Sequence, residues 1–307
     1  MKTFVDLFCG IGGFRVALES KGLKCVFSSD IDEKAQDAYE QNFSEKPEGD
    51  ITSIHEREIP THDILCAGFP CQSFSISGDR KGLDDNRGRL FYEIVRIAQY
   101  HNPQILILEN VKNILTVDNG NVIKIIRKKL DQIGYKLHVN ILNSSHFGVP
   151  QRRERVYFVG LRRDILATYN APKELNEKIY LENLLEPDVD EKMYIKRKDI
   201  HINKKDHDYS LKPIRIGIVN KGGQGERIYS AKGHSVTLSA YGGGVGARTG
   251  LYYVRDRVRK LTQNECKKLM GFSESHYVTE GTQGYQQLGN AVIPTMIQKV
   301  YESISFS

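Results

Sequence analysis

One segment of this 307-residue chain places a cysteine directly after a proline: G-F-P-C-Q-S-F-S, residues 68–75. A mainly apolar run, residues 63–67, leads into it, and a charged stretch with two glycines, residues 78–82, follows. This pattern predicts a buried strand that ends in a tight turn, with a loop beyond it. Because Pro70 fixes its own φ and disfavours helix at Phe69, Cys71 is expected at a stiff strand end. A thiol held there is suited to act as a nucleophile, whereas a lone cysteine more often packs as a small apolar residue.

A carboxyl group and a group of arginines are the next candidates for chemistry. Glu109 follows four apolar residues, so it either sits at an apolar sheet edge with a raised pKa, ready to carry a proton, or caps the next segment. The run Q-R-R-E-R, residues 151–155, precedes a strand-like stretch, and period-two alternation puts Arg153 and Arg155 on one face. This run is either a solvated charge cluster or a means of directing an arginine at an anion or a base carbonyl.

A glycine-rich turn, D-L-F-C-G-I-G-G at residues 6–13, joins the first strand-like run to a helical pattern. Such a turn can place backbone N–H groups around a polar ligand, although it can also be a plain tight turn. Asp30 ends the second strand-like run, where an acid can accept hydrogen bonds from a ribose diol; alternatively it is a surface acid or a helix cap. The turn lacks the G-x-G-x-x-G order, so the two features together favour S-adenosylmethionine over a dinucleotide.

The elements that must position these residues alternate in type over the first half of the chain. The alternation predicts an α/β fold with a doubly wound, mainly parallel, Rossmann-like sheet, in which ligands lie beyond the carboxyl ends of the strands. The turn at residues 10–13, Asp30, Cys71 and Glu109 all fall at such ends. Strands are expected at residues 3–8, 24–29, 63–67, 104–108, 136–142 and 155–159, and helices at residues 14–21, 33–42, 90–100 and 120–133.

The second half has a different texture, with ten glycines between residues 217 and 250. Short β-like pieces at residues 214–219, 235–240 and 251–254 predict a smaller, loop-rich β domain. Its glycine clusters either let the backbone approach something closely or are simple hairpin turns. Helical patterns return at residues 262–270 and 291–304, and the last is expected to pack on the first domain. We therefore expect a catalytic and cofactor-binding domain at residues 1–180, completed by 285–307, a recognition domain at 181–260 and a connecting segment at 261–284.

Composition excludes several classes of protein. The net charge of +6 is compatible with a polyanionic partner, without requiring one. Five cysteines, an odd number without C-x-x-C spacing, argue against a disulfide framework or a zinc site, so no metal is expected. No run approaches the roughly 18 apolar residues of a membrane helix, and the chain starts with a strand pattern rather than a signal peptide. A cytoplasmic location is therefore expected.

Six motifs occur in one order along the chain: D-L-F-C-G-I-G-G, G-F-P-C-Q-S-F-S, E-N-V, Q-R-R-E-R, R-K-L-T and Q-L-G-N-A-V. They begin at residues 6, 68, 109, 151, 259 and 287. In order and spacing they resemble the cytosine-C5 DNA methyltransferases, and the resemblance spans nearly the whole chain. The three motifs P-C-Q, E-N-V and Q-R-R-E-R carry most of this signal, because no single motif is specific enough.

The resemblance extends into the glycine-rich region. Residues 221–230 and 237–244 are similar to the recognition domain of the HhaI-type members, which methylate the inner cytosine of GCGC in bacterial restriction–modification. This similarity implies that the target sequence is GCGC or a closely related site. Ile31 stands where that type has a tryptophan near the cofactor's adenine, and residues 245–248 also differ.

The resemblance implies a role for each matching residue. Cys71 would attack C6 of a flipped-out cytosine, Glu109 would act at N3, Arg155 would hold O2 and orient Glu109, and Arg153 would support them. The loop at residues 73–89 would close over the base. The cofactor pocket would be formed by Phe8, Gly10, Gly12, Gly13, Asp30, Asp50, Ile51, Pro70, Leu90, Asn290 and Val292, and the DNA contacts by Ser77, Gln224, Arg227, Tyr241 and Gly244.

The implied partners are double-stranded DNA and S-adenosylmethionine, which leaves as S-adenosylhomocysteine. The resemblance also implies that the enzyme is a monomer and that it associates with the nucleoid through DNA. It further implies a cognate restriction endonuclease in the same system. The first alternative is an RNA (tRNA) cytosine-C5 methyltransferase, whose C-F-T signature is absent from this sequence. A DNA-binding paralogue without activity is the second, and the trio Cys71, Glu109 and Arg155 argues against it.

Overall fold

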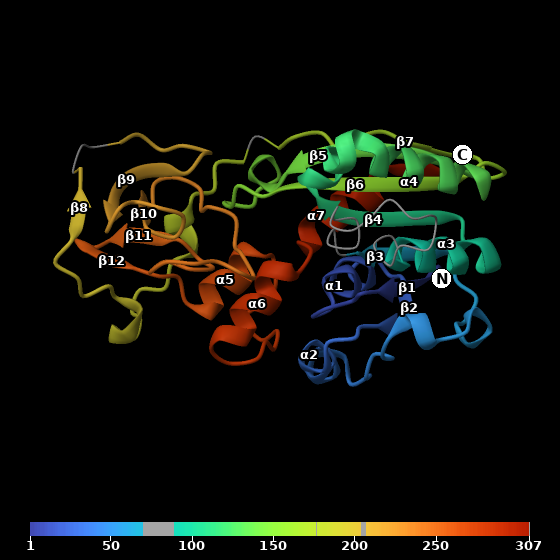
Figure 1. Cartoon of the computed structure of the whole chain (residues 1–307), viewed down its shortest axis with the longest axis horizontal. Coiled ribbons are helices and arrows are strands. Elements are labelled where there is room, and N and C mark those ends of the chain that lie inside the picture. The colour runs from blue at the N-terminus through green and yellow to red at the C-terminus, as the bar shows by residue number, and fades with distance from the viewer. Residues whose placement is uncertain (70–88, 176, 204–206, 307) are drawn as a thin grey trace. The chain divides into compact units, whose positions relative to one another are not determined.

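The computed structural model describes residues 1–69, 89–175, 177–203 and 207–306, and the chain divides into two compact units. The first unit comprises Met1–Leu142, Glu154–Pro172 and Met296–Ser307, and the second comprises Asn143–Arg153 and Lys173–Thr295. Figure 1 labels most of the helices and strands of both units. We refer to them below as the first and the second unit.

A six-stranded sheet with the order β2-β1-β3-β4-β6-β5 forms the first unit. The pairs β1–β2, β1–β3 and β3–β4 are parallel, whereas β4–β6 is antiparallel. This confirms the predicted mainly parallel α/β fold. The strands are β1 (Thr3–Leu7), β2 (Lys24–Ser29), β3 (Ile64–Gly68), β4 (Ile105–Val111), β5 (Tyr135–Asn143) and β6 (Glu154–Arg162).

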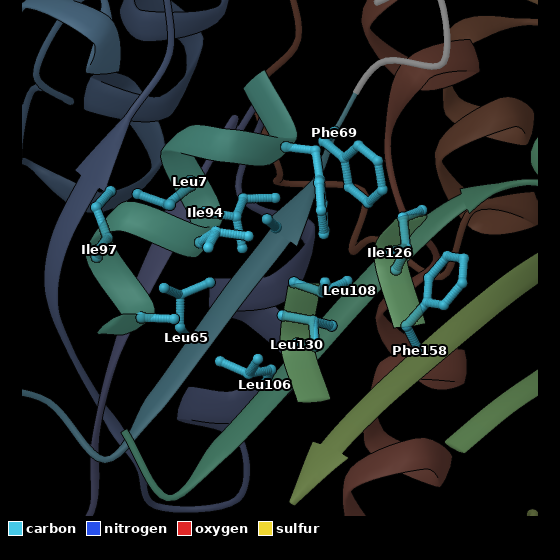
Figure 2. Close-up of a cluster of buried hydrophobic side chains, with 14 of the residues drawn as sticks. Leu7, Leu65, Phe69, Ile94, Ile97, Leu106, Leu108, Ile126, Leu130 and Phe158 are labelled. Carbon is cyan, nitrogen blue, oxygen red and sulfur yellow. The ribbon is translucent and has the colours of Figure 1, made fainter. Parts of the chain in front are cut away.

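Successive side chains of each strand point to opposite faces of the sheet, and both sets are buried. Helices must therefore cover both faces. Leu65, Leu106 and Leu108 share one core cluster with Ile94 of α3 and Ile126 of α4, so these two helices pack on the same face (Figure 2). The helices of this unit are α1 (Gly13–Glu19), α2 (Glu33–Phe43), α3 (Arg89–His101), α4 (Asn121–Gln132) and α7 (Pro294–Glu302).

The C-terminal end of the chain belongs to the first unit, as the sequence predicted for its last helix. Strand β13 (Ile304–Phe306) pairs antiparallel with β7 (Ala167–Tyr169). Gln298 of α7 donates to the hydroxyl of Ser20 at the end of α1, at 2.8 Å. Helix α7 begins at Pro294 rather than at residue 291, in keeping with the preference of proline for the first helical turn.

A separate five-stranded sheet, β12-β11-β10-β9-β8, forms the β part of the second unit. It has its own small core, which includes Val219, Ile228 and Leu251. The strands are β8 (Ile200–Ile202), β9 (Ile214–Val219), β10 (Arg227–Ser230), β11 (Leu251–Val254) and β12 (Arg257–Arg259), and the helices are α5 (Gln263–Leu269) and α6 (Thr282–Asn290).

One expectation for this region was wrong, and one helix was missed. Residues 235–240 do not form a strand. Ser235 makes one isolated bridge to Gln151, and the N–H and C=O of Leu238 bond to the side chains of Gln151 and Arg153 instead of to a neighbouring strand. Helix α6 was missed because its sequence, TQGYQQLGN, has two glycines and little apolar periodicity. The functional domain boundaries expected from the sequence remain a prediction. No helix in the described parts of the chain is long and apolar enough to span a membrane.

Candidate active site

The glycine turn after β1 is held against the end of β2. Cys9 donates its N–H to the carbonyl of Ser29 at 3.0 Å, and Gly10 donates to Asp30 Oδ2 at 2.7 Å. Phe8, Gly10 and Gly12 all have positive φ, which turns the backbone sharply into α1. At Gly12 a Cβ would lie 2.3 Å from the ring of Phe43, so a side chain there has no room. At Gly10 it would meet no atom within 4 Å, so space is open beside the turn.

Asp30 is a fixed, partly buried carboxylate at this edge. Its Oδ1 accepts the N–H of Asp32 at 2.9 Å while its Oδ2 accepts from Gly10. Burial raises the pKa of Asp30 above its ordinary value, and the backbone donors oppose that rise. Each carboxylate oxygen retains a further lone pair that can accept from a ligand. The neighbouring Ile31 is 72% exposed, which leaves an apolar surface next to the carboxylate.

Asp50 reaches the same edge through the backbone of Glu48. Glu48 donates to Ser28 O and accepts from the N–H of Asp30, both at 2.9 Å, so the chain runs along the end of β2. Asp50 Oδ1 then accepts from Thr52 at 2.9 Å and caps a short 3-10 turn that begins with the buried Ile51. Gly13 begins α1 and Leu90 lies in the first turn of α3.

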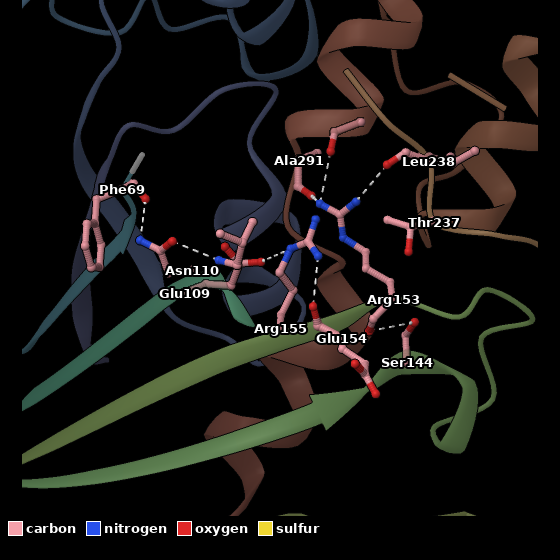
Figure 3. A network of polar contacts seen from close by, with 12 residues as sticks. Phe69, Glu109, Asn110, Ser144, Arg153, Glu154, Arg155, Thr237, Leu238 and Ala291 are labelled. Carbon is pink, nitrogen blue, oxygen red and sulfur yellow. Dashed lines mark hydrogen bonds and ion pairs between the residues drawn. The ribbon is translucent and has the colours of Figure 1, made fainter. Parts of the chain in front are cut away.

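Glu109 and Arg155 are in direct contact (Figure 3). Strand β6 runs antiparallel to β4, so its first residues lie at the carboxyl edge of the sheet, and Arg155 pairs with Val111. Arg155 Nε lies 3.1 Å from Glu109 Oε1, and Arg155 also donates to the carbonyl of Glu154 at 2.9 Å. Both side chains are largely buried, with 14% and 10% exposed, which strengthens an ion pair relative to water. Arg155 therefore contacts the carboxyl group of Glu109 directly, and its role in orienting that group remains a prediction.

Asn110 is a site residue to which sequence reasoning gave no role. It is 2% exposed, its side-chain amide donates to the carbonyl of Phe69 at 2.8 Å, and its Oδ1 accepts from Val111 at 2.8 Å. The contact joins the end of β3 to the end of β4. Its position beside Glu109 in the E-N-V motif was the available signal.

Pro70, Cys71 and Ser77 lie outside the described residues, so their predicted roles remain predictions. The other four cysteines are buried, and burial raises the pKa of each thiol. The same edge holds another buried acid, Asp6, whose pKa is raised well above its ordinary value by burial and by Asp30. No group of three or more metal-ligating side chains occurs among the described residues.

Arg153, Asn290 and Val292 belong to the second unit. Arg153 is 3% exposed, and its guanidinium donates to three backbone carbonyls, those of Leu238, Gly289 and Ala291, at 3.3, 3.0 and 2.9 Å. Its contacts thus differ from those of Arg155, although the alternation argument placed the two together. Strand β6 begins at Glu154, so the period-two rule does not extend to Arg153.

The predicted DNA-contacting residues of the second unit surround two glycine loops that pack against each other. Gly246 donates to the carbonyl of Gly225 at 2.6 Å, and a Cβ at Gly225 would lie 2.0 Å from Gly243 O. The glycines therefore serve a close approach between two loops, which goes beyond hairpin turns. Gln224 and Tyr241 are exposed on these loops, Arg227 is exposed at the start of β10, and Gly244 has a positive φ of 83°.

Comparisons with known proteins agree with this arrangement. The chain matches the family model of the C-5 cytosine-specific DNA methylases over residues 2–305. Type II methyltransferase M.HhaI from Haemophilus parahaemolyticus is 46% identical, covering 99% of this chain and 94% of that protein. Type II methyltransferase M.HaeII from Haemophilus aegyptius is 39% identical and covers 98% and 92%.

Solved structures show the same fold. The S. pombe Dnmt2 methyltransferase has a TM-score of 0.75 at 20% identity and covers 99% of this chain and 98% of its own. A putative DNA modification methyltransferase from an E. coli prophage has a TM-score of 0.74 at 16% identity, with 99% and 98% covered. Likeness at these identities establishes the fold, while the family match over nearly the full length establishes the activity. The chain therefore belongs to the C-5 cytosine-specific DNA methylases: it is a DNA cytosine-C5 methyltransferase of the type II restriction–modification kind, with S-adenosylmethionine as methyl donor.

Proposed function

We propose that this enzyme methylates the inner cytosine of GCGC, or of a closely related duplex site, through a covalent adduct between Cys71 and C6 of a flipped-out base. The observation that carries the proposal is the contact of Arg155 Nε with Glu109 Oε1 at 3.1 Å, at the end of the strand next to the one that leads to Cys71. The 46% identity with M.HhaI and the similarity within residues 221–244 support the target sequence.

The edge beyond β1 and β2 fits the nucleoside part of the methyl donor. The open space beside Gly10, the fixed carboxylate of Asp30 and the exposed Ile31 supply room, an acceptor for hydroxyl groups and an apolar surface. When bound, S-adenosylmethionine supplies an electrophilic methyl group. Its further contacts are proposed to be Phe8, Gly12, Gly13, Asp50, Ile51, Pro70, Leu90, Asn290 and Val292.

The residues of the chain supply the activation of the base. Cytosine C5 is a weak nucleophile, so the Cys71 thiolate adds to C6 and the ring becomes enamine-like. In its protonated form, Glu109 donates a proton or a hydrogen bond to N3, which neutralises the charge that develops on the ring, and it recovers the proton when the adduct breaks down. Arg155 holds Glu109 and binds O2 of the base. After C5 gains its methyl group, a base removes the C5 proton, the C6–S bond breaks, and the thiolate is regenerated.

The target base must leave the duplex, because the helix hides C5 and C6. Extrusion costs roughly a few kcal/mol. Ser77 and Gln224 are proposed to fill the vacated space. Arg227 is proposed to read a guanine edge, a contact worth about 1–3 kcal/mol of discrimination. Tyr241 and Gly244 complete the proposed DNA surface. We also propose that the enzyme acts as a monomer alongside a cognate restriction endonuclease.

The decisive experiment is bisulfite sequencing of random-sequence duplex DNA after incubation with the enzyme and S-adenosylmethionine. We expect new 5-methylcytosine at the inner cytosine of GCGC, and methylation confined to another sequence would refute the target. A parallel reaction with a tRNA pool tests the alternative substrate, and faster methylation of tRNA than of duplex would decide for it.

The proposed nucleophile has its own test. Cys71→Ser is expected to abolish methyl transfer while duplex binding persists, because the hydroxyl is a far weaker nucleophile than a thiolate. Denaturing gels of wild type with a GCGC duplex carrying 5-fluorocytosine should show a covalent complex that the variant lacks. An adduct in the Cys71→Ser protein, or normal turnover by it, would exclude this cysteine.

A further inference from the structure

Arg153 connects two segments of the second unit that are distant in sequence. Its guanidinium donates to Leu238 O, 85 residues away, and to the carbonyls of Gly289 and Ala291, 136 and 138 residues away (Figure 3). The side chain is 3% exposed. A buried guanidinium in a fixed fork restrains the carbonyls that it binds, because leaving any of them unsatisfied is costly.

The first segment, residues 235–240, is fixed to the Q-R-R motif rather than to a sheet. Ser235 donates to Pro150 O at 2.8 Å and accepts from Arg152 N at 2.9 Å. At Leu238, Gln151 Oε1 accepts the N–H at 3.1 Å and Arg153 donates to the C=O. Side chains of the motif thus bind both backbone polar groups of Leu238. The exposed Tyr241 and its glycine loop follow directly, so this anchoring sets where the proposed DNA-contacting loop begins.

The second segment, residues 289–291, lies against the first. A Cβ at Gly289 would be 2.4 Å from Ala240 N and 2.6 Å from Ser239 C, so glycine is needed for the approach. The two carbonyls that accept from Arg153 flank Asn290, whose side chain is exposed. The same guanidinium therefore restrains the backbone on both sides of a residue proposed to bind the cofactor.

We propose that Arg153 is a positioning residue that couples DNA recognition to cofactor binding, by holding the recognition segment 235–240 and the cofactor segment 289–291 in one arrangement. The inference rests on the proposed roles of Tyr241, Gly244 and Asn290. A ligand that orders either segment orders the shared guanidinium, and the second ligand then binds with less ordering left to do. Such coupling is reciprocal, so each ligand raises the affinity for the other by the same factor.

Binding measurements on the full-length protein test the coupling. The dissociation constant of S-adenosylhomocysteine is measured by calorimetry without DNA and with a saturating GCGC duplex, and the ratio of the two is the coupling factor. We expect a wild-type factor of about 5 or more, falling below about 2 in Arg153→Gln, with Arg153→Lys between them. Arg152→Gln is the matched control. It makes the same chemical change at the exposed neighbouring position and should leave the coupling factor unchanged.

An unchanged factor in Arg153→Gln, or a wild-type factor of 1, would overturn the coupling role. Bisulfite sequencing with the wild type distinguishes this from failure of the proposed function, because GCGC methylation can persist without any coupling.

A second measurement needs no variant: S-adenosylhomocysteine alone, without DNA, should slow amide hydrogen exchange in residues 235–241 of the wild type. Exchange there that is indifferent to S-adenosylhomocysteine would also overturn the proposal. This readout keeps the test valid even where a substitution at this buried site unfolds the protein.

Discussion

Glu109 and Arg155 form an ion pair, and the position of each side chain depends on contact with the other. Arg155 directs its Nε at Glu109 Oε1 and its Nη1 at the carbonyl of Glu154, a division that a lysine ammonium cannot reproduce. We expect Arg155→Lys to lower kcat roughly 10²-fold or more, with a smaller change in KM for S-adenosylmethionine. Steady-state tritium transfer to a GCGC duplex measures both constants.

Arg163→Lys is the control for this substitution. Arg163 is exposed and pairs with Asp131 on the surface. Replacing its guanidinium with an ammonium group should therefore leave kcat unchanged. If Arg155→Lys behaves like Arg163→Lys, Glu109 does not need the guanidinium for its orientation.

The four cysteines in the described part of the chain should be poorly reactive. Cys9, Cys25, Cys66 and Cys266 are buried, and burial raises the pKa of each thiol, in the case of Cys25 to about 12. The thiolate is the reactive form, so these four should resist alkylation in the native state. We expect iodoacetamide at pH 8 to label Cys71 alone, as read by peptide mass spectrometry. Labelling of any buried cysteine before Cys71 would refute this order.

At the scale of elements, one buried ion pair fixes the start of α5 to the end of β12. Arg259 binds Glu265 through two bonds of 2.8 and 2.7 Å, and the two side chains are 1% and 0% exposed. Glu265 also accepts from the N–H groups of Thr262 and Glu186. Removing one partner leaves an uncompensated buried charge, so Glu265→Ala should lower the free energy of unfolding by about 3–5 kcal/mol. Urea denaturation followed by circular dichroism measures the change.

The second unit offers an exposed counterpart with similar geometry. Glu191 binds Arg257 through two bonds of 2.7 and 2.8 Å, but the side chains are 60% and 44% exposed. Water screens such a pair, so Glu191→Ala should leave the urea midpoint almost unchanged. Equal effects of the two substitutions would show that burial does not set the strength of the Arg259–Glu265 pair.

At the scale of the whole molecule, stability should depend on pH through groups buried in the first unit. His62 is 4% exposed, and burial lowers its pKa from 6.5 to about 4. The unfolded chain therefore takes up a proton near pH 6.5 that the folded protein refuses until about pH 4. His62 thus destabilises the fold as pH falls through this window, by about 3 kcal/mol in total.

Other buried groups act in the opposite direction. Burial raises the pKa of Asp6 and of Asp30 in the fold, so their contribution is lost as pH rises above the unfolded value of 3.8. The contribution of His62 is isolated by comparing wild type with His62→Gln at pH 7.5 and pH 4.5, where the variant should lose less stability on acidification. His201→Gln, at an exposed position in β8, is the control and should follow wild type. Parallel curves for wild type and His62→Gln would contradict the assignment.

The sequence by itself determined the family, the mainly parallel α/β sheet and the placing of several candidate residues at its edge. Strand periodicity and turn residues are local signals, and parallel strands bring their carboxyl ends together whatever the details of packing. The turn at Gly10, Asp30 and Glu109 could therefore be assigned to one edge from order alone. Cys71 rests on the same local argument, and its setting remains a prediction.

The tertiary structure decided which partner each side chain meets. Arg153 and Arg155 are two residues apart, yet one binds backbone carbonyls of the second unit and the other binds Glu109. Asn110 bonds to Phe69 across 41 residues, and residues 235–240 are anchored by side chains where a strand was predicted. Contacts between segments that are distant in sequence depend on the tertiary packing of the whole chain. The spacing of residues along the sequence does not specify that packing.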